Sequence, residues 1–590
     1  MLTRIWRLLD GNERRRLLQL IPLVLLTAGF ELIGVSAVIP FVTLLADPDG
    51  VLALPIVGPW IEASGVSDTG ALLRYAGLGL ALAVLIANAL VMLTRYRQYR
   101  FAAQLTYTMS SRLLAHYLAQ PYAFTLTRNS ASLTNTVMQQ VDRVAQGVGS
   151  GLQLLTAGVT IVALLVFLVA LDPLLALASF GMLGGLYGAI FLVSRRYLTR
   201  TSRELAAIGA ARFKAINEAM GGFKDLKVAG RERSALRHYQ VPARRQAQIQ
   251  ANVSAISALP RYALEAIAVG GVVVIASLMA GRDGAFATTL PLLAAYVFGA
   301  LRLMPAMQSV FAAFAKLRNT QGAVEILEAD LREAGEVGDA LADAPPPLPF
   351  AHSIALRGVS YHYPAGDEAA LRGIDLVIEK GRSLGIVGRT GSGKTTLVNV
   401  LLGLLEPSEG HVEVDGAAAV ALADKRAYRR LFGYVPQDIF LLDDSVRRNV
   451  ALGIPDDEID DAAVRLACVQ AQVDDFIERE LPTSYDTIVG ERGVRLSGGQ
   501  RQRVGIARAL YHQPAVLVFD EATSALDVHT ERRVFEALEA IAKERTLVMI
   551  AHRLETVAKA DRVIVLDAGR VVDAGSSADV VGRYRQVVPQ

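Results

Sequence analysis

Apolar residues are concentrated in roughly the first 320 residues of the chain, where six stretches are long enough to cross a membrane. A membrane-spanning helix requires about 20 mostly apolar residues. The stretches lie near 17–46, 75–94, 144–171, 174–194, 262–281 and 288–315. This pattern predicts an all-α, six-helix transmembrane domain.

Two polar stretches, 95–143 and 195–258, keep the apolar spacing of helices. We expect the membrane helices to continue through them into the cytoplasm; the alternative is two disordered loops. Breaks at Gln120-Pro121-Tyr122 and Gly221-Gly222-Phe223 interrupt the spacing, because proline and paired glycines end helices. They predict short crosswise helices that touch the second domain.

The distribution of Lys and Arg orients these helices. Segment 195–245 is rich in both, whereas Arg74 is the only basic residue of 47–74. Cytoplasmic loops carry the excess of positive charge, so both termini are predicted to be cytoplasmic. The arginine-rich, amphipathic start, 1–16, predicts a helix lying on the membrane surface. Segment 51–64 is too short to span and is expected at the outer interface.

A change of composition marks the start of a second domain. The acidic, helical stretch 325–343 ends at a proline cluster, 345–349, and β-type apolar runs follow. We predict a transmembrane domain over 1–324, a linker over 325–350 and an α/β domain over 351–590.

The chain is 52% hydrophobic and 20% charged, which favours a membrane protein. Its net charge of +3 is too small to imply a nucleic-acid partner. Cys468 is the single cysteine, which excludes an internal disulfide and a cysteine-ligated zinc site.

A glycine-rich loop in the second domain predicts a nucleotide site. It follows the apolar strand 383–387 directly and opens a helix, which is the context of a P-loop. Backbone N–H groups of 391–396 can cradle the β- and γ-phosphates. Lys394 adds a positive charge and the Thr395 hydroxyl can bind Mg²⁺. The predicted ATP-binding residues of this segment are Gly388, Arg389, Thr390, Gly391, Ser392, Gly393, Lys394, Thr395 and Thr396.

Two further apolar strands end in residues suited to phosphate chemistry. Strand 516–520 ends in Asp520, which can hold Mg²⁺ through water, and Glu521, which can accept a proton from the attacking water. Strand 546–551 is followed by His552. A single histidine there is either structural or a γ-phosphate contact, and the neighbouring motifs favour the contact.

These motifs resemble the ATP-binding cassette (ABC) family, and the resemblance covers the whole chain. The glycine loop matches Walker A, and 516–521 matches Walker B with the catalytic Glu521. Leu496-Ser-Gly-Gly-Gln500 matches the family signature, and His552 the switch histidine. The matching signature residues are Ser497, Gly498, Gly499 and Gln500.

The resemblance implies further roles. Gln437 matches the Q-loop residue that links Mg²⁺ and water to the membrane part, and Tyr363 matches the aromatic that stacks on adenine, with Tyr361 as the alternative. Segment 524–527 matches the D-loop. Segment 489–493 is similar to an exporter loop that contacts the intracellular helix tips. Catalysis is then assigned to Glu521, His552, Lys394 and Gln437, and Mg²⁺ binding to Thr395, Gln437 and Asp520.

The signature also predicts the assembly. Its N–H groups and the positive end of the helix predicted to begin near Gln500 suit a γ-phosphate. Because the signature and the P-loop belong to different subdomains, one chain is not expected to bring both to one nucleotide. Two chains packed head-to-tail can enclose two ATPs, so the working unit is predicted to be a homodimer with two competent sites. Fusion of six helices to the ATPase resembles the exporter branch, which implies a bacterial inner-membrane protein with a cytoplasmic ATPase domain.

Charges within the apolar stretches indicate the cargo, because each is costly to insert. Arg302, Arg261 and Glu31 are the candidate substrate contacts. The alternatives are a snorkelling role for Arg302, a local pair of Arg261 with Glu265, and helix packing for Glu31. The strings around these residues resemble bacterial lipid-linked oligosaccharide flippases of the PglK type. That resemblance implies an anionic polyprenyl-pyrophosphate glycan moved to the outer leaflet, although the second span is neutral from Tyr75 to Thr94. A general lipid or multidrug exporter is the second hypothesis, and an ATP-gated channel or non-transporting membrane ATPase the third.

Overall fold

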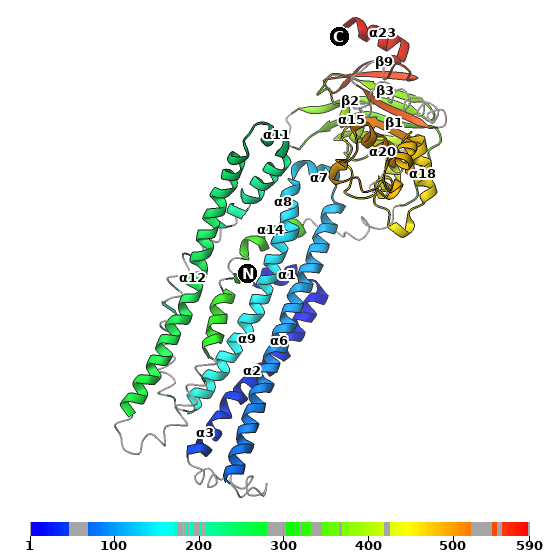
Figure 1. Ribbon diagram of the computed structural model, residues 1–590. Coiled ribbons are helices and arrows are strands. Elements are labelled where there is room, and N and C mark those ends of the chain that lie inside the picture. The colour runs from blue at the N-terminus through cyan, green and yellow to red at the C-terminus, as the bar shows by residue number, and fades with distance from the viewer. Residues whose placement is uncertain are drawn as a thin grey trace. The chain divides into compact units, whose positions relative to one another are not determined.

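The computed structural model in Figure 1 divides into two compact units. The helical unit comprises Met1–Ala119 and Arg128–Leu341, and the α/β unit comprises Gln120–Thr127 and Ala342–Gln590. The division after Leu341 lies inside the predicted linker. Gln120–Thr127 joins the second unit although its neighbours in the chain belong to the first. The structure describes residues 2–46, 69–171, 211–279, 303–314, 320–332, 345–364, 368–417, 425–520, 545–551 and 557–587, with scattered positions in 173–209 and 299–317.

Long helices separated by short ones build the helical unit (Figure 1). Helix α2 begins after Asp10, whose N–H is accepted by the Glu13 carboxylate at 2.9 Å, an N-terminal capping interaction. The helices of the unit are α1 Leu2–Leu8, α2 Gly11–Ser36, α3 Val38–Ala46, α6 Thr69–Ala119, α8 Ser130–Asn135, the π-helix η1 Thr136–Gln140, α9 Val141–Leu171, α11 Phe223–Val228, α12 Glu232–Met279 and α14 Gln321–Arg332.

Several of the predicted membrane spans coincide with helices of this unit. In the described part, Gly11–Leu45, Gly70–Ala119 and Ser132–Ala170 are long and apolar enough to cross a membrane, and Leu303–Phe314 is a shorter apolar helix. They overlap the first, second, third and sixth predicted spans. The fifth overlaps α12 as far as Met279. The fourth lies largely outside the described residues, as does the short external segment 51–64.

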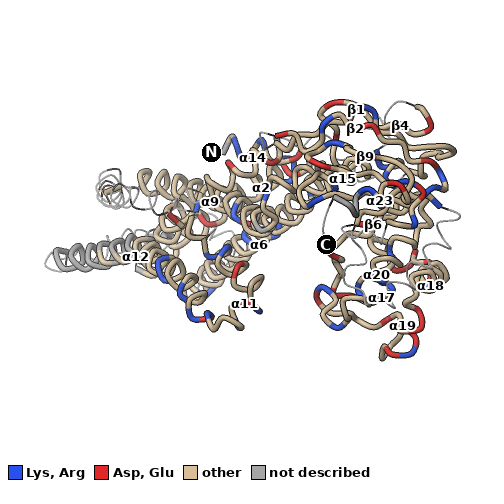
Figure 2. The backbone as a smooth tube through the Cα atoms, turned by 90° about the horizontal axis from the view of Figure 1, so that it is seen from above, with Lys and Arg blue, Asp and Glu red and all other residues tan. Residues whose placement is uncertain are grey.

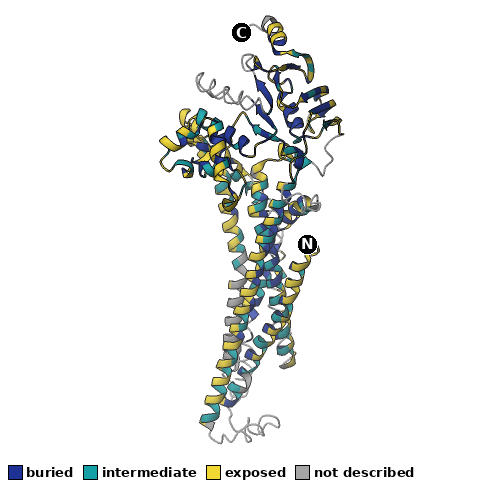
Figure 3. Cartoon of the chain, turned by 90° about the vertical axis from the view of Figure 1, so that its right-hand side faces the viewer, coloured by how far each residue is buried: buried dark blue, intermediate teal, exposed yellow. Residues whose placement is uncertain are grey.

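Helices α2, α6 and α9 pack against one another. Val24 of α2, Ala87 of α6 and Leu164 of α9 are buried between them. Leu78 and Leu85 on the other side of α6 are exposed, which suits a face turned to lipid. Figure 3 shows the same division, with buried residues between the helices and exposed ones on the outer surface.

Both predicted breaks are confirmed. Helix α6 ends at Ala119, and the short helix α7, Tyr122–Thr127, follows Pro121. Gly222 precedes the short helix α11. Lys and Arg gather on α11 and the adjoining part of α12 (Figure 2), as expected of a cytoplasmic turn. The π-helix η1 at the start of α9 was not anticipated from the sequence.

Two sheets form the framework of the α/β unit. The antiparallel sheet has the order β2-β1-β4 and the larger sheet the order β5-β6-β7-β3-β8-β9. The larger sheet is parallel except for β9, which pairs antiparallel with β8. The strands are β1 Ser353–His362, β2 Ala369–Glu379, β3 Ser383–Val387, β4 Glu409–Val414, β5 Phe432–Val435, β6 Val516–Asp520, β7 Thr546–Ala551, β8 Arg562–Asp567 and β9 Arg570–Ser576.

Helices cover both faces of the larger sheet. Besides α7, the described helices of the α/β unit are α15 Lys394–Leu401, α16 Lys425–Arg429, α17 Val446–Val450, α18 Asp461–Gln470, α19 Asp474–Glu480, α20 Gly498–Tyr511 and α23 Ser577–Val587, with 3-10 turns η4 Asp456–Glu458, η5 Ser484–Asp486 and η6 Glu491–Gly493. Alternate strand residues enter two separate cores. Val518 of β6 packs with α15 and the antiparallel sheet, whereas Leu517 and Phe519 pack with α18 and α20. Strand alternation therefore places α15 and α20 on opposite faces.

Candidate functional site

The glycine-rich loop lies where the sequence places it. Residues 388–393 connect the end of β3 to the start of α15, so the predicted strand, loop and helix are confirmed. A Cβ atom on Gly388 would lie 2.3 Å from the Leu566 carbonyl oxygen, and one on Gly393 would lie 2.7 Å from the Ala370 carbonyl oxygen. Gly393 also has a φ of 103°. Only glycine allows so close an approach of the loop to the neighbouring backbone at these two positions.

Polar groups converge on the inside of this loop. Lys394 is 6% exposed, and its ammonium donates to the carbonyl oxygens of Gly388 and Arg389 at 2.8 and 3.0 Å. The Ser392 hydroxyl is buried and has no hydrogen-bond partner among the described residues. A caged ammonium, an unsatisfied hydroxyl and the N-terminus of α15 together suit a polyphosphate. The loop therefore fits the phosphates of ATP.

The aromatic residues upstream of the loop differ in placement. The Tyr363 hydroxyl lies 3.0 Å from the Thr396 hydroxyl in the first turn of α15. Tyr361 is buried in the core, with its ring edge-on to Tyr363. Tyr363 is thus the tyrosine beside the phosphate loop, and the adenine-stacking role stays with it as a prediction.

The residues expected to hold Mg²⁺ leave the same edge of the sheet. Asp520 is the last residue of β6, is buried, and accepts a hydrogen bond from the Tyr434 hydroxyl at 3.3 Å. Burial, and then the nearby carboxylate, raise the pKa of Tyr434 above its ordinary value, so this hydroxyl stays a neutral donor. Gln437 is exposed just beyond β5, the strand paired with β6. Thr395 is exposed on the first turn of α15.

The signature segment forms a capped helix start. Helix α20 begins at Gly498, two residues earlier than the sequence suggested. The Ser497 hydroxyl accepts from the Gln500 N–H at 3.2 Å, and the Gln500 side-chain oxygen accepts from the Ser497 N–H at 2.7 Å. This capping box leaves the N–H groups of Gly498 and Gly499 at the open end of the helix. Such an end attracts anions.

The phosphate loop and the signature are anchored in different cores. Leu397 and Leu401 of α15 lie in one core, and Ile506 and Leu510 of α20 lie in the other. Because the sheet separates the two helices, the signature of a chain cannot close over the nucleotide on its own loop. Completion of the nucleotide site by the signature of a second chain therefore stays a prediction.

Several predicted site residues cannot be placed. Glu521, His552 and Arg302 lie outside the described residues, as does the D-loop segment 524–527. Arg261 lies within α12, but its side chain is outside the described part. Their roles stay predictions.

Glu31 lines a polar pocket in the helical unit. The pocket has a volume of about 280 Å³ and lies between α2, α6, α9 and the helix 303–314. Three hydrogen bonds form a ring that joins α2, α6 and α9 in pairs. The ring consists of Thr27 to Thr94 at 2.6 Å, Gln98 to Thr156 at 2.9 Å, and Thr160 to Glu31 at 2.8 Å. The three bonds tie the helices together, which supports the packing role that was one alternative for Glu31.

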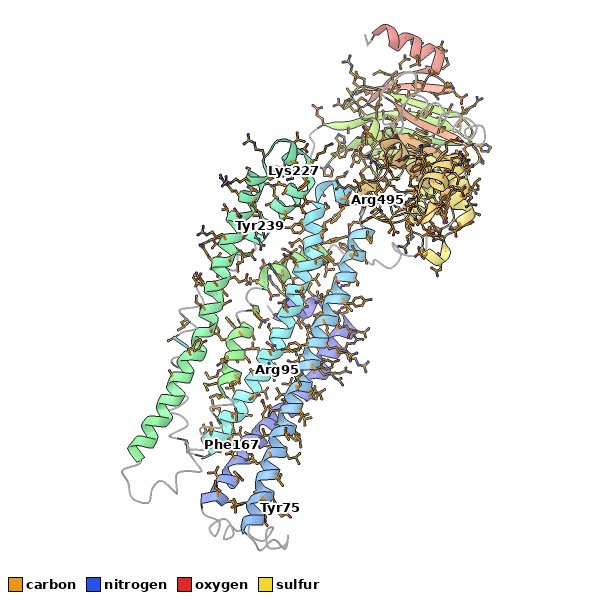
Figure 4. All side chains as sticks on the ribbon, viewed as in Figure 1. Tyr75, Arg95, Phe167, Lys227, Tyr239 and Arg495 are labelled. Carbon is orange, nitrogen blue, oxygen red and sulfur yellow. The ribbon has the colours of Figure 1, made fainter. Side chains whose placement is uncertain are left out.

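Arg95 and Gln153 also line this pocket. Figure 4 labels Arg95 partway along α6, away from Tyr75 near the start of that helix. Arg95 was missed because it directly follows the neutral stretch that ends at Thr94, where it reads as a flanking charge. A signal was present in the sequence: Thr94, Arg95 and Gln98 share one face at helical spacing.

Comparisons with known proteins agree with this architecture. Residues 51–301 match the family described as ABC transporter transmembrane region, and residues 371–524 match the family described as ABC transporter. An "ATP-dependent lipid A-core flippase" of Thiobacillus denitrificans is 31% identical over 535 residues, 90% of this chain and 91% of the relative. The "Heterocyst differentiation ATP-binding protein HepA" of Nostoc sp. is 30% identical over 94% of this chain and 90% of that protein.

The fold has a solved counterpart. The structure of a bacterial Atm1-family ABC exporter with ATP bound superimposes with a TM-score of 0.71 and 25% identity, covering 98% of this chain and all of that one. The two matching families, the relatives that align along most of their length and the solved exporter therefore all indicate the same two-domain architecture. The chain belongs to the ABC transporter family, as an exporter whose transmembrane domain is fused to its ATPase domain.

Proposed function

We propose that this protein is a homodimeric, ATP-driven flippase that moves a phosphate-bearing glycolipid from the cytoplasmic to the outer leaflet of the bacterial inner membrane. The observation that carries the cargo class is the polar pocket of the helical unit. It contains a carboxylate, a guanidinium, amides and hydroxyls within helices that are otherwise apolar. Polar groups at this depth are costly to insert and are retained for function or for interhelical bonding.

Two classes of glycolipid carry a headgroup of this kind. Relatives are named for the lipid A-core, whereas the strings around Arg261 and Arg302 favour a polyprenyl-pyrophosphate oligosaccharide. Both carry phosphate for a guanidinium and sugar hydroxyls for carboxylate and amide groups. In this proposal Arg95 and Glu31 contact the headgroup, with Arg261 and Arg302 as further basic contacts.

The ATPase chemistry follows from the α/β unit. We propose that Lys394 and the loop N–H groups hold the β- and γ-phosphates, and that Tyr363 stacks on adenine. Thr395, Gln437 and Asp520 offer the oxygen ligands that Mg²⁺ prefers, and the ion would neutralise phosphate charge there. Glu521 accepts the proton of the attacking water, and His552 contacts the γ-phosphate. The signature of the partner chain, led by Ser497, closes over the same phosphate.

A flipping assay tests the cargo. The protein is reconstituted in liposomes that contain labelled lipid A, a labelled polyprenyl-pyrophosphate glycan or labelled phosphatidylcholine, and ATP-dependent transfer between leaflets is measured for each. We expect transfer of a phosphate-bearing glycolipid to exceed that of phosphatidylcholine. Equal transfer of all three would contradict the proposal and favour a general lipid or multidrug exporter.

Variants then test the pocket. Arg95→Ala removes the guanidinium, and Glu31→Gln removes the charge while keeping an acceptor for Thr160. Arg97→Ala is the matched control, because Arg97 is exposed on the same helix and does not line the pocket. We expect transfer of the glycolipid to fall in the Arg95 and Glu31 variants only. Wild-type transfer by the double variant would rule the pocket out as the headgroup site.

A further inference from the structure

A buried carboxylate lies near the end of α14, outside the nucleotide site and the pocket. Asp330 is 5% exposed. It accepts a hydrogen bond from the Tyr117 hydroxyl at 2.5 Å and pairs with the Arg128 guanidinium at 3.6 Å. A buried charge is tolerated only when it is paired and hydrogen-bonded, and removing one partner of such a pair is strongly unfavourable. The three side chains therefore form one electrostatic unit.

The two partners of Asp330 flank the segment that belongs to the α/β unit. Tyr117 is in the last turn of α6, two residues before Ala119, and Arg128 is the first residue after Thr127. Between them lies α7, whose Ala123 packs against the core of the α/β unit. Asp330 itself precedes the point where the chain passes to that unit for the second time, at Ala342. Residues close to both ends of the α7 segment thus meet at a carboxylate of the helix that precedes the second passage.

Helix α14 is held to the rest of the helical unit along its length. Arg4 of α1 lies 3.5 Å from Glu325 and 4.0 Å from Glu328. Leu327 is fully buried. Before the helix begins, Thr320 contacts α9 so closely that a Cβ on Gly147 would lie 2.7 Å from it.

The π-helix η1 packs against α14, α6 and α9 at this place. Single π-helical turns occur frequently at functional sites. Asp330 thus lies two residues before the end of α14, on a helix that packs against the π-helix.

We propose that Asp330 is a positioning residue for energy coupling: through Tyr117 and Arg128 it fixes both ends of the α7 segment to the helix that leads into the ATPase domain. Any displacement of α7 then acts on α14 as well, because both chain ends of the segment hold the same carboxylate. The contact joins a buried carboxylate to a half-exposed guanidinium, so its loss would leave the Asp330 charge buried without its ion-pair partner. Its loss separates the two connections while leaving the nucleotide site intact.

The inference rests on ATP-driven transport, but its test does not depend on the cargo. In the homodimer a spin label at Arg233→Cys, exposed on α12, reports one distance between protomers. The label is placed in a Cys468→Ala background. The distance is measured with and without ATP and vanadate, alongside ATP hydrolysis. Lipid transfer per ATP hydrolysed is measured where transfer is observed. Absence of transfer in the wild type would contradict the flippase proposal alone, since the distance change is still measured.

Asp330→Asn keeps the shape of the side chain and an acceptor for Tyr117 but removes the charge that Arg128 pairs with. Hydrolysis is expected to stay within about twofold of wild type, while the distance change and the transfer per ATP fall by about fivefold or more. Arg128→Gln, at a position 45% exposed, should give the same result without a risk to folding. The double variant should be no worse than either single one, because all three remove the same pair.

Glu328→Gln is the control, since it makes the same chemical change on the same helix at a carboxylate that faces Arg4. It should leave hydrolysis, distance change and transfer unaltered. The inference is overturned if Arg128→Gln and Asp330→Asn keep the full distance change. It is equally overturned if hydrolysis and coupling fall together in Arg128→Gln, which would indicate a structural role.

Discussion

Completion of each ATP site by a second chain can be tested by mixing two inactive variants. Lys394→Ala removes the caged ammonium of the phosphate loop. Ser497→Arg removes the cap of α20 and fills the open end of that helix. Because α15 and α20 lie on opposite faces of the larger sheet, the two changes affect separate structural elements, and each variant should fold.

The arrangement of the two motifs sets the expected activity. Each homodimer of one variant has no intact site. In a heterodimer, the chain that carries Ser497→Arg still has an intact phosphate loop, and the chain that carries Lys394→Ala still has an intact signature. These two motifs meet at one site, so one of the two sites is complete. Random pairing of equal amounts makes about half of the dimers heterodimers, so about a quarter of all sites are intact. If one chain supplied both motifs, none would be.

The assay uses two affinity tags and isolates the heterodimer in succession on both. ATP hydrolysis, and the nucleotide trapped by vanadate after hydrolysis of a photoreactive labelled ATP analogue, are measured for the heterodimer and for each homodimer. We expect trapping in the heterodimer, with label on the chain that carries Ser497→Arg and none on the chain that carries Lys394→Ala. Label on neither chain would refute the shared site, and the wild-type pair carrying the same two tags controls for the purification.

Three further outcomes are expected. Glu521→Gln should keep ATP binding but lower hydrolysis about a hundredfold or more, as measured by nucleotide binding and phosphate release; substantial residual hydrolysis would place the proton acceptor elsewhere. Burial raises the pKa of Cys468 to about 12, so maleimide at pH 8 should not label the folded protein and should label it on unfolding, with mass spectrometry as the readout; rapid labelling of the folded protein would contradict the buried position. Gly147→Ala should lower the melting temperature, because the new methyl group meets Thr320 and overpacking costs about 1–3 kcal/mol of stability; adding Thr320→Ala should restore the melting temperature, and failure to restore it would contradict the contact.

Local chemistry made much of the α/β unit predictable. The strand before Gly388, the loop and the helix from Lys394 are adjacent in sequence, so their pattern alone determines the site. The start of α20 was placed two residues late because Ser497 and Gln500 form a capping box. That box makes Gln500 the third residue of the helix rather than its first.

The features missed in the helical unit depend on residues far apart in the chain. Periodicity identifies α6, α9 and α14, but it does not say which faces meet. The pair of Asp330 with Tyr117 spans 213 positions. The sequence indicates only that Glu325–Asp343 is acidic and helical, whereas in the structure Asp330 within it is buried. A single acidic residue with helical neighbours gives no signal for burial until its partners are placed.

The ring of hydrogen bonds around the pocket also constrains how the helices can move. Thr27, Thr94, Gln98, Thr156, Thr160 and Glu31 form three bonds that close on themselves through α2, α6 and α9. Moving one of these helices alone would break two of the three bonds, so we expect the three helices to move together. None of the three bonds involves the helix 303–314. In that helix the Ser309 hydroxyl donates to the Pro305 carbonyl oxygen, one turn earlier, at 2.8 Å. Among the described helices that line the pocket, 303–314 is therefore the one whose displacement would change the pocket without breaking the ring.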